Sequence, residues 1–151
     1  MRQRRGAPEG PGVTGPARVD PRTKNLTKRL RPGEIAIIDH LDIDRVSAEA
    51  LAACRPLAVL NAQRSTSGRY PNLGPEILLE AGITLVDDLG PDVLTLVEGH
   101  PVRVVDGEVY DGDRLVAEGT VQDSESVAAA LEDARAGLAV QFGNLAGRAA
   151  S

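Results

Sequence analysis

The residues whose types and spacing could do chemistry gather in one loop, at positions 63–74. The loop carries three consecutive hydroxyl side chains with arginines on both sides, and two glycines. It follows a predicted buried strand and precedes a predicted helix, where open α/β sheets bind ligands. Hydroxyls, arginines and the first amides of a helix could hold an anion such as a phosphate or a carboxylate. The candidate ligand- or partner-binding residues are Ser65, Thr66, Ser67, Gly68, Arg69, Tyr70, Asn72 and Gly74.

The alternative for this loop is a rigid turn whose glycines and prolines only satisfy the backbone geometry. The loop lacks the Gly-Lys-Ser/Thr ending of a Walker loop and the Gly-x-Gly-x-x-Gly spacing of a dinucleotide-binding turn. A phosphate-containing ligand is therefore the one small molecule that the pattern suggests, and we expect no resident cofactor.

A second candidate is the segment 39–44, where aspartates alternate around His40. Such a set could ligate a divalent ion, but an aspartate between a strand and a helix is more often a helix cap. We therefore predict no metal site. No nucleophile, base and orienting group can be combined from the sequence, so we expect no catalytic residues and no activity of the chain's own.

The charge is unevenly distributed. Residues 1–31 hold nine Arg or Lys against Glu9 and Asp20, a net charge of +7, whereas the remainder holds 8 basic and 20 acidic residues, a net charge of −12. The basic segment could bind nucleic acid or an anionic membrane, fold onto its own domain, or stay solvated. Since it contains no aromatic side chain to stack on bases, we expect nucleic acid not to be the partner.

The apolar content predicts a cytoplasmic domain. No stretch reaches the ~20 apolar residues that a bilayer span needs. The one cysteine, Cys54, cannot form an internal disulfide, and its apolar surroundings favour a small buried residue over a reactive thiol.

The elements that must position the loop follow the order β-α-β-α-β-α, which predicts parallel strands with helices packed on them. Buried strands are expected at 34–39, 57–61 and 83–86, and helices at 44–54, 75–81 and 92–97. Upstream, we expect a short strand at 17–19 and a basic helix at 21–30 that Asp20 caps. Downstream, two Asp-Gly turns predict a meander of strands at 102–105, 108–110 and 115–117.

A last helix is predicted from about residue 123. Its apolar residues recur at nearly the spacing of a coiled-coil seam, at Val127, Leu131, Ala134, Leu138 and Leu145. The helix is expected to connect to a following domain or to form a homodimer, with packing on its own domain as the alternative. The predicted organisation is a disordered basic arm over 1–16, an α/β domain over 17–121, and a linker or dimer helix with a tail over 122–151.

Several segments carry a resemblance to a known family, at residues 12–15, 17–20, 22–24, 30–40 and 67–75. The most specific is Ser-Gly-Arg-Tyr-Pro-Asn-Leu-Gly-Pro at 67–75. From about residue 13 to 142 the chain resembles the N-terminal region of the SteA-type cytokinetic ring proteins of actinobacteria. The resemblance implies a non-catalytic module that acts by protein–protein contacts in cell division and cell separation, with a membrane-associated partner.

The family members continue into a thiamine-pyrophosphokinase-like domain and a C-terminal membrane segment, and the resemblance stops before both. We therefore expect a fragment, a truncated form or a divergent product. The resemblance also implies an alternative function, an accessory domain that binds nucleotide or phosphate for such an enzyme.

The order of elements also resembles the swivelling phosphohistidine domain of enzymes that use phosphoenolpyruvate. This resemblance implies a swivelling β/β/α-like α/β domain, with short parallel strands, a β-meander and a C-terminal connector helix. The phosphoryl-carrying His of that family is missing here, where Arg69, Tyr70, Asn72 and Leu73 stand. We expect the fold to carry over and the phosphoryl chemistry not to.

Overall fold

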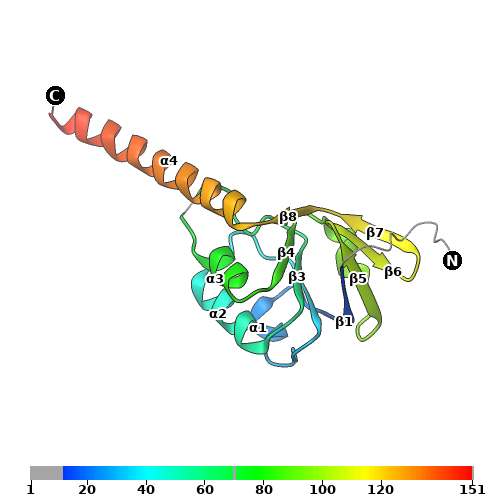
Figure 1. The fold of residues 1–151 in the computed structure, drawn as a ribbon. Coiled ribbons are helices and arrows are strands. Elements are labelled where there is room, and N and C mark those ends of the chain that lie inside the picture. The colour runs from blue at the N-terminus through cyan, green and yellow to red at the C-terminus, as the bar shows by residue number, and fades with distance from the viewer. Residues whose placement is uncertain (1–11, 70, 151) are drawn as a thin grey trace.

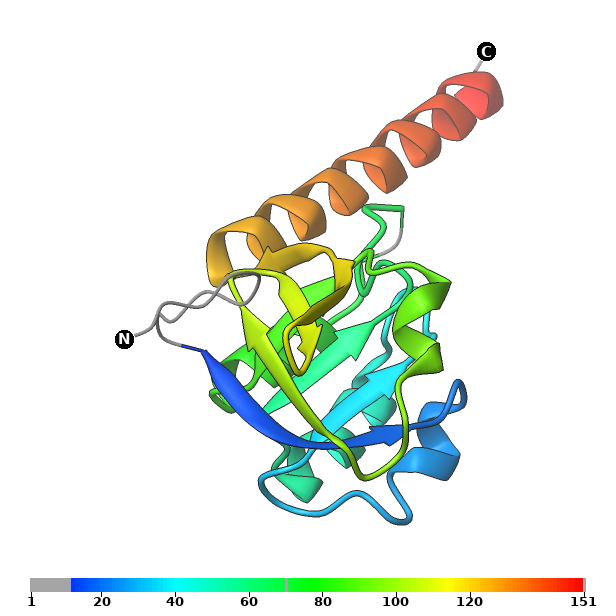
Figure 2. The same ribbon diagram turned by 90° about the vertical axis from the view of Figure 1, so that its right-hand side faces the viewer.

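The computed structural model describes residues 12–69 and 71–150, with side chains as far as residue 139. Within that part, eight strands form one mixed sheet in the order β7-β6-β5-β1-β2-β3-β4-β8 (Figures 1 and 2). The strands are β1 Val13–Val19, β2 Ile35–Ile38, β3 Ala58–Asn61, β4 Thr84–Asp87, β5 Pro101–Val105, β6 Glu108–Asp111, β7 Arg114–Glu118 and β8 Thr120–Gln122. The helices are α1 Thr23–Leu26, α2 Arg45–Cys54, α3 Gly74–Glu80, the 3-10 helix η1 Pro91–Thr95 and α4 Ser124–Ala150.

The four central strands, β1 to β4, are parallel, as the alternation of strands and helices predicts. Both faces of these strands are covered, which explains their continuous apolar runs. In β2, Ile35 and Ile37 face one core and Ala36 and Ile38 face the other. The second core contains residues of α1, α2 and α3, so these helices cover one face of the parallel strands.

The other face of the parallel strands is covered by the antiparallel strands β5, β6 and β7, whose apolar residues share the first core with those of β1 to β4. β5 pairs antiparallel with β1, and the Asp-Gly turn after β5 has positive φ at Asp106 and Gly107, as a tight hairpin requires. The amide of Gly119 donates to the carbonyl of Gly107 at 2.8 Å, which joins this hairpin turn to the start of β8. The result is the β/β/α layering that the sequence analysis expected.

Helix α4 leaves this body and extends well beyond it (Figure 1). Its start is capped by Asp123, whose carboxylate accepts the amide of Ser126 at 2.7 Å. Val127 and Ala134 are buried against the body. At 1.5 Å per residue the helix is about 40 Å long. No helix in the described ranges has both the length and the apolar character that crossing a membrane requires.

Several predicted boundaries need correction. β1 begins at Val13, inside the arm expected to be disordered, because Val13 and Thr14 pair with β5. The basic helix expected over 21–30 is a regular helix only at Thr23–Leu26, and Asp20 does not cap it but accepts the amide of Arg22. The short helix after β4 is a 3-10 helix at Pro91–Thr95. Residues 1–11 lie outside the described part.

Candidate functional site

A buried carboxylate, Asp87, fixes the start of the candidate loop to the sheet. Asp87 ends β4 and is 1% exposed. Its Oδ1 accepts a hydrogen bond from the Ser65 hydroxyl at 2.6 Å, and its Oδ2 accepts from the Ser65 amide at 2.9 Å and from Gln122 Nε2 at 3.0 Å. Burial raises the pKa of Asp87 to about 6, although these hydrogen bonds favour the charged form. Ser65 is therefore held by a residue that the sequence analysis did not single out.

A second buried side chain, Asn61, connects this loop to the segment after β2. Its Nδ2 donates to the carbonyl of His40 and to the hydroxyl of Ser65, both at 2.8 Å. Its Oδ1 accepts the amides of His40 and Gln63, both at 3.0 Å. The Ser65 hydroxyl thus accepts from Asn61 and donates its proton to Asp87, so that proton is not available to a ligand.

The later part of the loop is held in the same way. Asp42 accepts the Ser67 amide at 2.7 Å and the Ser67 hydroxyl at 2.9 Å. Asn72 Nδ2 donates to the carbonyls of Ile43 and Ser65, both at 2.9 Å, while its Oδ1 is buried with no hydrogen bond to the rest of the described chain. Thr66 is 5% exposed. None of the three predicted hydroxyls is therefore presented freely to solvent.

Two glycines shape the loop, as predicted for Gly68 and Gly74. Gly68 has φ +81°, a conformation that other residues rarely adopt. At Gly74 a β-carbon would collide with the carbonyl oxygen of Ile43. The start of α3 therefore packs directly on the segment between β2 and α2.

Arginines remain on the outside of the loop. Arg69 is exposed, and Arg64 Nε lies 3.9 Å from Asp88 Oδ2, too far for a hydrogen bond. Tyr70, the other contact residue proposed from the sequence, lies outside the described residues. The carboxylates of Asp42 and Asp88 lie on the segments around these arginines, which weakens the loop as a site for an anion.

Exposed apolar side chains border the contact between the loop and the segment after β2. Leu41 is 54% exposed, Val46 73% and Leu73 40%. Asn72 and Gly74, on either side of Leu73, contact Ile43, which lies between Leu41 and Val46 in sequence. We call Leu41, Val46, Leu73 and Arg69 the docking surface. In both views the loop before α3 rises beside α4 (Figures 1 and 2).

The segment 39–44 uses its polar groups for structure. Asp44 caps α2 by accepting the Ser47 amide at 3.2 Å, which confirms the cap interpretation for that residue. His40 Nδ1 lies 2.8 Å from Thr23 Oγ1, and its Nε2 lies 3.5 Å from Asp44 Oδ1. No cluster of three or more His, Cys, Asp or Glu side chains that could hold a metal ion occurs among residues 12–69 and 71–139.

Part of the basic N-terminal segment folds onto its own domain. Arg18 lies 2.8 Å from the buried carboxylate of Glu34. Burial alone would raise the pKa of Glu34, but hydrogen bonds from Arg18 and the Arg31 amide lower it. Arg29 pairs with Asp20 and Glu98, both at 3.1 Å. Two of the nine basic residues in positions 1–31 are thus neutralised within the protein.

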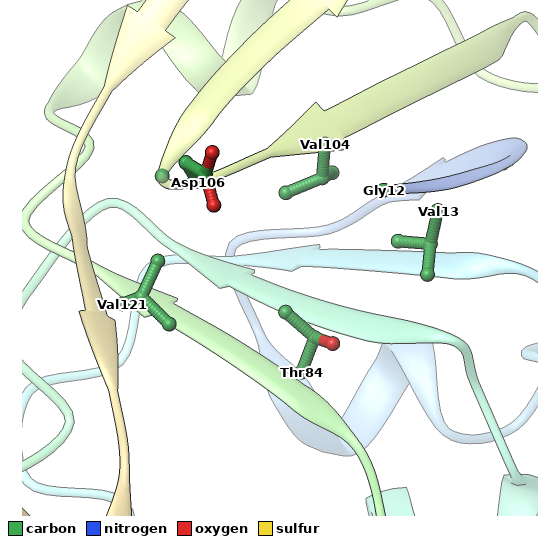
Figure 3. Close-up of a pocket in the computed structure, with 7 residues that line it drawn as sticks. Gly12, Val13, Thr84, Val104, Asp106 and Val121 are labelled. Carbon is green, nitrogen blue, oxygen red and sulfur yellow. The ribbon is translucent and has the colours of Figure 1, made fainter. Parts of the chain in front are cut away.

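A cleft that the sequence analysis missed lies at the amino ends of the parallel strands. It has a volume of about 400 Å³. Figure 3 shows side chains from different strands around it: Val13 of β1, Thr84 of β4, Val104 of β5 and Val121 of β8. Among the described residues that line it, Asp106 is the charged one. Because its lining comes from strands distant in sequence, no local pattern could have indicated it.

Cys54 is half-buried, and burial raises the pKa of its thiol. The thiol lies 3.3 Å from the carbonyl oxygen of Ala50. Its environment therefore favours the packed, protonated form over a reactive thiolate.

In comparisons with known proteins, no protein-family model matches the chain, and a search of curated proteins gave no match.

Proposed function

We propose that this chain is a non-catalytic module that acts by protein–protein contacts, as part of a cell-division protein of the SteA type. The observation that carries the proposal is the docking surface: exposed apolar side chains lie on the loop and on the segment that it contacts, and the Ser65 and Ser67 hydroxyls of the loop are bonded internally. The SteA resemblance supplies the kind of partner, a membrane-associated cell-division protein, and a cytoplasmic location.

The physical basis is the combination of rigidity and exposed apolar area. Gathered apolar side chains mark interaction sites more often than scattered ones do. A loop held by Asp87, Asn61 and Asp42 loses little conformational entropy when a partner binds, so less of the binding free energy is lost. Arg69 adds a residue type that is enriched in interfaces.

The site offers little to catalysis. Ser65 is the hydroxyl nearest a carboxylate, but it is 0% exposed and its neighbours are Asp87 and Asn61, with no imidazole among its hydrogen-bond partners. An activated serine needs both a base and access to a substrate. This supports a binding role.

The alternative proposal is an accessory domain that binds nucleotide or phosphate for a thiamine-pyrophosphokinase-like enzyme. Exposed Arg64 and Arg69 favour it, and the nearby carboxylates of Asp42 and Asp88 disfavour it. Calorimetric titration with nucleotides and thiamine phosphates separates the two proposals, because the docking proposal predicts no heat of binding.

The test of the docking proposal replaces two apolar residues of the surface. The variant Val46→Ser/Leu73→Ser and the control Val97→Ser/Leu115→Ser each lose two exposed apolar side chains. Each protein is expressed in actinobacterial cells, cross-linked to its neighbours and recovered, and its partners are identified by mass spectrometry.

We expect recovery of a membrane-associated cell-division protein to fall about 10-fold in the docking variant, as loss of two moderate interface residues implies. Recovery should be unchanged in the control, and Arg69→Ala should lower it as well. Equal recovery with both double variants would contradict the proposal.

A further inference from the structure

The segment 22–31 presents a row of cations to solvent. Hydrogen bonds from the Thr27 amide to Thr23 and from the Leu30 amide to Leu26 continue the helical turns past the end of α1. Thr23, Leu26 and Leu30 are buried, spaced as one face of a helix. The opposite face is exposed and carries the basic residues of this segment, Arg22, Lys24, Lys28, Arg29 and Arg31.

Four of these cations form no ion pair in the described part of the chain, although the charge of Arg31 acts on the nearby Glu34. The carboxylates nearest to this segment, Asp20, Glu34 and Glu98, already pair with Arg18 and Arg29. In contrast, Arg22, Lys24, Lys28 and Arg31 form no ion pair within the described part of the chain. We call these four residues the basic face.

The basic face lies on a molecule that is otherwise acidic. Residues 32–151 carry a net charge of −12. In both views α1 lies at the end of the body away from α4 (Figures 1 and 2). A concentrated positive end on an acidic body orients the protein toward a negatively charged surface.

We propose that the basic face binds the anionic phospholipid surface of a membrane, with α4 directed away from it. Clusters of four to eight Lys and Arg are typical of such binding. Nucleic acid fits less well, because α1 has four residues and the segment 22–31 contains no aromatic residue to stack on bases.

The expected strength follows from the number of cations. Each Lys or Arg near an anionic leaflet raises partitioning about five-fold. Removing two of the four should therefore weaken binding about 25-fold, and raising the ionic strength should weaken it further.

The experiment is co-sedimentation of the full chain with vesicles of equimolar phosphatidylglycerol and phosphatidylcholine, over a range of salt concentrations. Lys24→Ala/Lys28→Ala tests the basic face. Arg114→Ala/Arg135→Ala removes two exposed cations elsewhere, of which Arg114 pairs with Asp111, and is the control for the loss of two positive charges. A chain lacking residues 2–11 separates the basic face from the upstream arginines. Thermal unfolding confirms that each variant folds, and a short DNA duplex is tested as a competing ligand.

Binding to these vesicles but not to pure phosphatidylcholine, reduced about 25-fold in the lysine variant and retained in the control, would support the proposal. Absence of vesicle binding would overturn it, as would equal binding of the two double variants. Binding lost entirely on removal of residues 2–11, or tighter binding to DNA than to vesicles, would also overturn it. None of these residues belongs to the docking surface, so failure here leaves the docking proposal standing.

Discussion

Replacing Asp87 with asparagine tests whether burial of this carboxylate makes the stability of the fold depend on pH. Asparagine has nearly the same shape. With its carbonyl oxygen in place of Oδ2 it accepts from the Ser65 amide and from Gln122, and its amide nitrogen in place of Oδ1 can donate to the Ser65 hydroxyl oxygen. The pKa of Asp87 in the folded protein is raised by burial to about 6, against 3.8 for an ordinary aspartate. The variant therefore removes a titrating group with little change of shape.

The direction of the effect follows from proton binding. Between the two pKa values the folded protein binds more protons at Asp87 than the unfolded chain does, so the free energy of unfolding falls as the pH rises. The stabilisation is complete below the unfolded pKa and is lost as the pH rises through the folded pKa. The shift corresponds to about 3 kcal/mol in total, of which about 2 kcal/mol lies between about pH 4.5 and about pH 7.5.

The assay is urea denaturation of both proteins across this pH range, followed by circular dichroism. The difference in unfolding free energy between wild type and Asp87→Asn cancels the contributions of the other titrating groups. We expect this difference to move in favour of the variant by about 2 kcal/mol as the pH rises from about 4.5 to about 7.5.

Asp88→Asn is the matched control for this prediction. Asp88 is an exposed neighbouring carboxylate with φ +59°, a conformation that asparagine tolerates. The Asp88 charge is the smallest of the effects that act on the pKa of Asp87, so its replacement should leave most of the pH dependence in place. Parallel pH profiles for wild type and Asp87→Asn would refute the assignment of a raised pKa to the buried carboxylate.

Two further predictions concern packing and α4. Gly74→Ala should lower the unfolding free energy by about 3 kcal/mol, because the added methyl group collides with the carbonyl of Ile43. Gly137→Ala should raise the unfolding free energy by about 0.5 to 1 kcal/mol, because its added methyl group has no neighbouring atom within 4 Å. An equal effect of the two substitutions in chemical denaturation would contradict this prediction. If α4 pairs with a second copy, light scattering should give a dimer for the full chain and a monomer for a version ending at residue 139. If the full chain and the shortened version have the same oligomeric state, residues 140–151 do not form the dimer contact.

Most of the sheet could be predicted because its signals are local. The run at 57–61 and the observed strand Ala58–Asn61 differ by one residue, since a short apolar stretch between turns fits a buried parallel strand. The Asp-Gly pair after β5 also predicts the hairpin from adjacent residues alone, because both residues tolerate the positive φ of a tight turn. β1 was predicted too short, because Val13 is held by Val104, which lies some ninety residues downstream and gives no local signal.

The sequence predicts where the candidate loop lies in the fold but not which way its side chains point. The residue types indicate a polar loop beyond a parallel strand, and the structure places it there. Which way Ser65 and Ser67 point is decided by Asp87 and Asp42, which lie elsewhere in the chain and accept these hydrogen bonds only when the chain is folded. Sequence spacing carries no information about that pairing, so hydroxyls available to a ligand and hydroxyls bound to a buried carboxylate look alike.

The internal use of these hydroxyls gives a reason why so polar a loop fits a docking role. A surface loop outside a strand ladder is ordered only if other groups supply its hydrogen bonds. The amides of Asp42 and Ile43 donate to the carbonyls of Arg64 and Ser65, and side chains supply further hydrogen bonds. Here Asn61, Asn72 and two carboxylates supply them, and the loop then presents Leu73 and Arg69 from a fixed backbone. The same Asp87 accepts from Gln122, whose Oε1 accepts the hydroxyl of Ser126 at 2.7 Å in the first turn of α4. One hydrogen-bond network thus joins the loop to the first turn of α4.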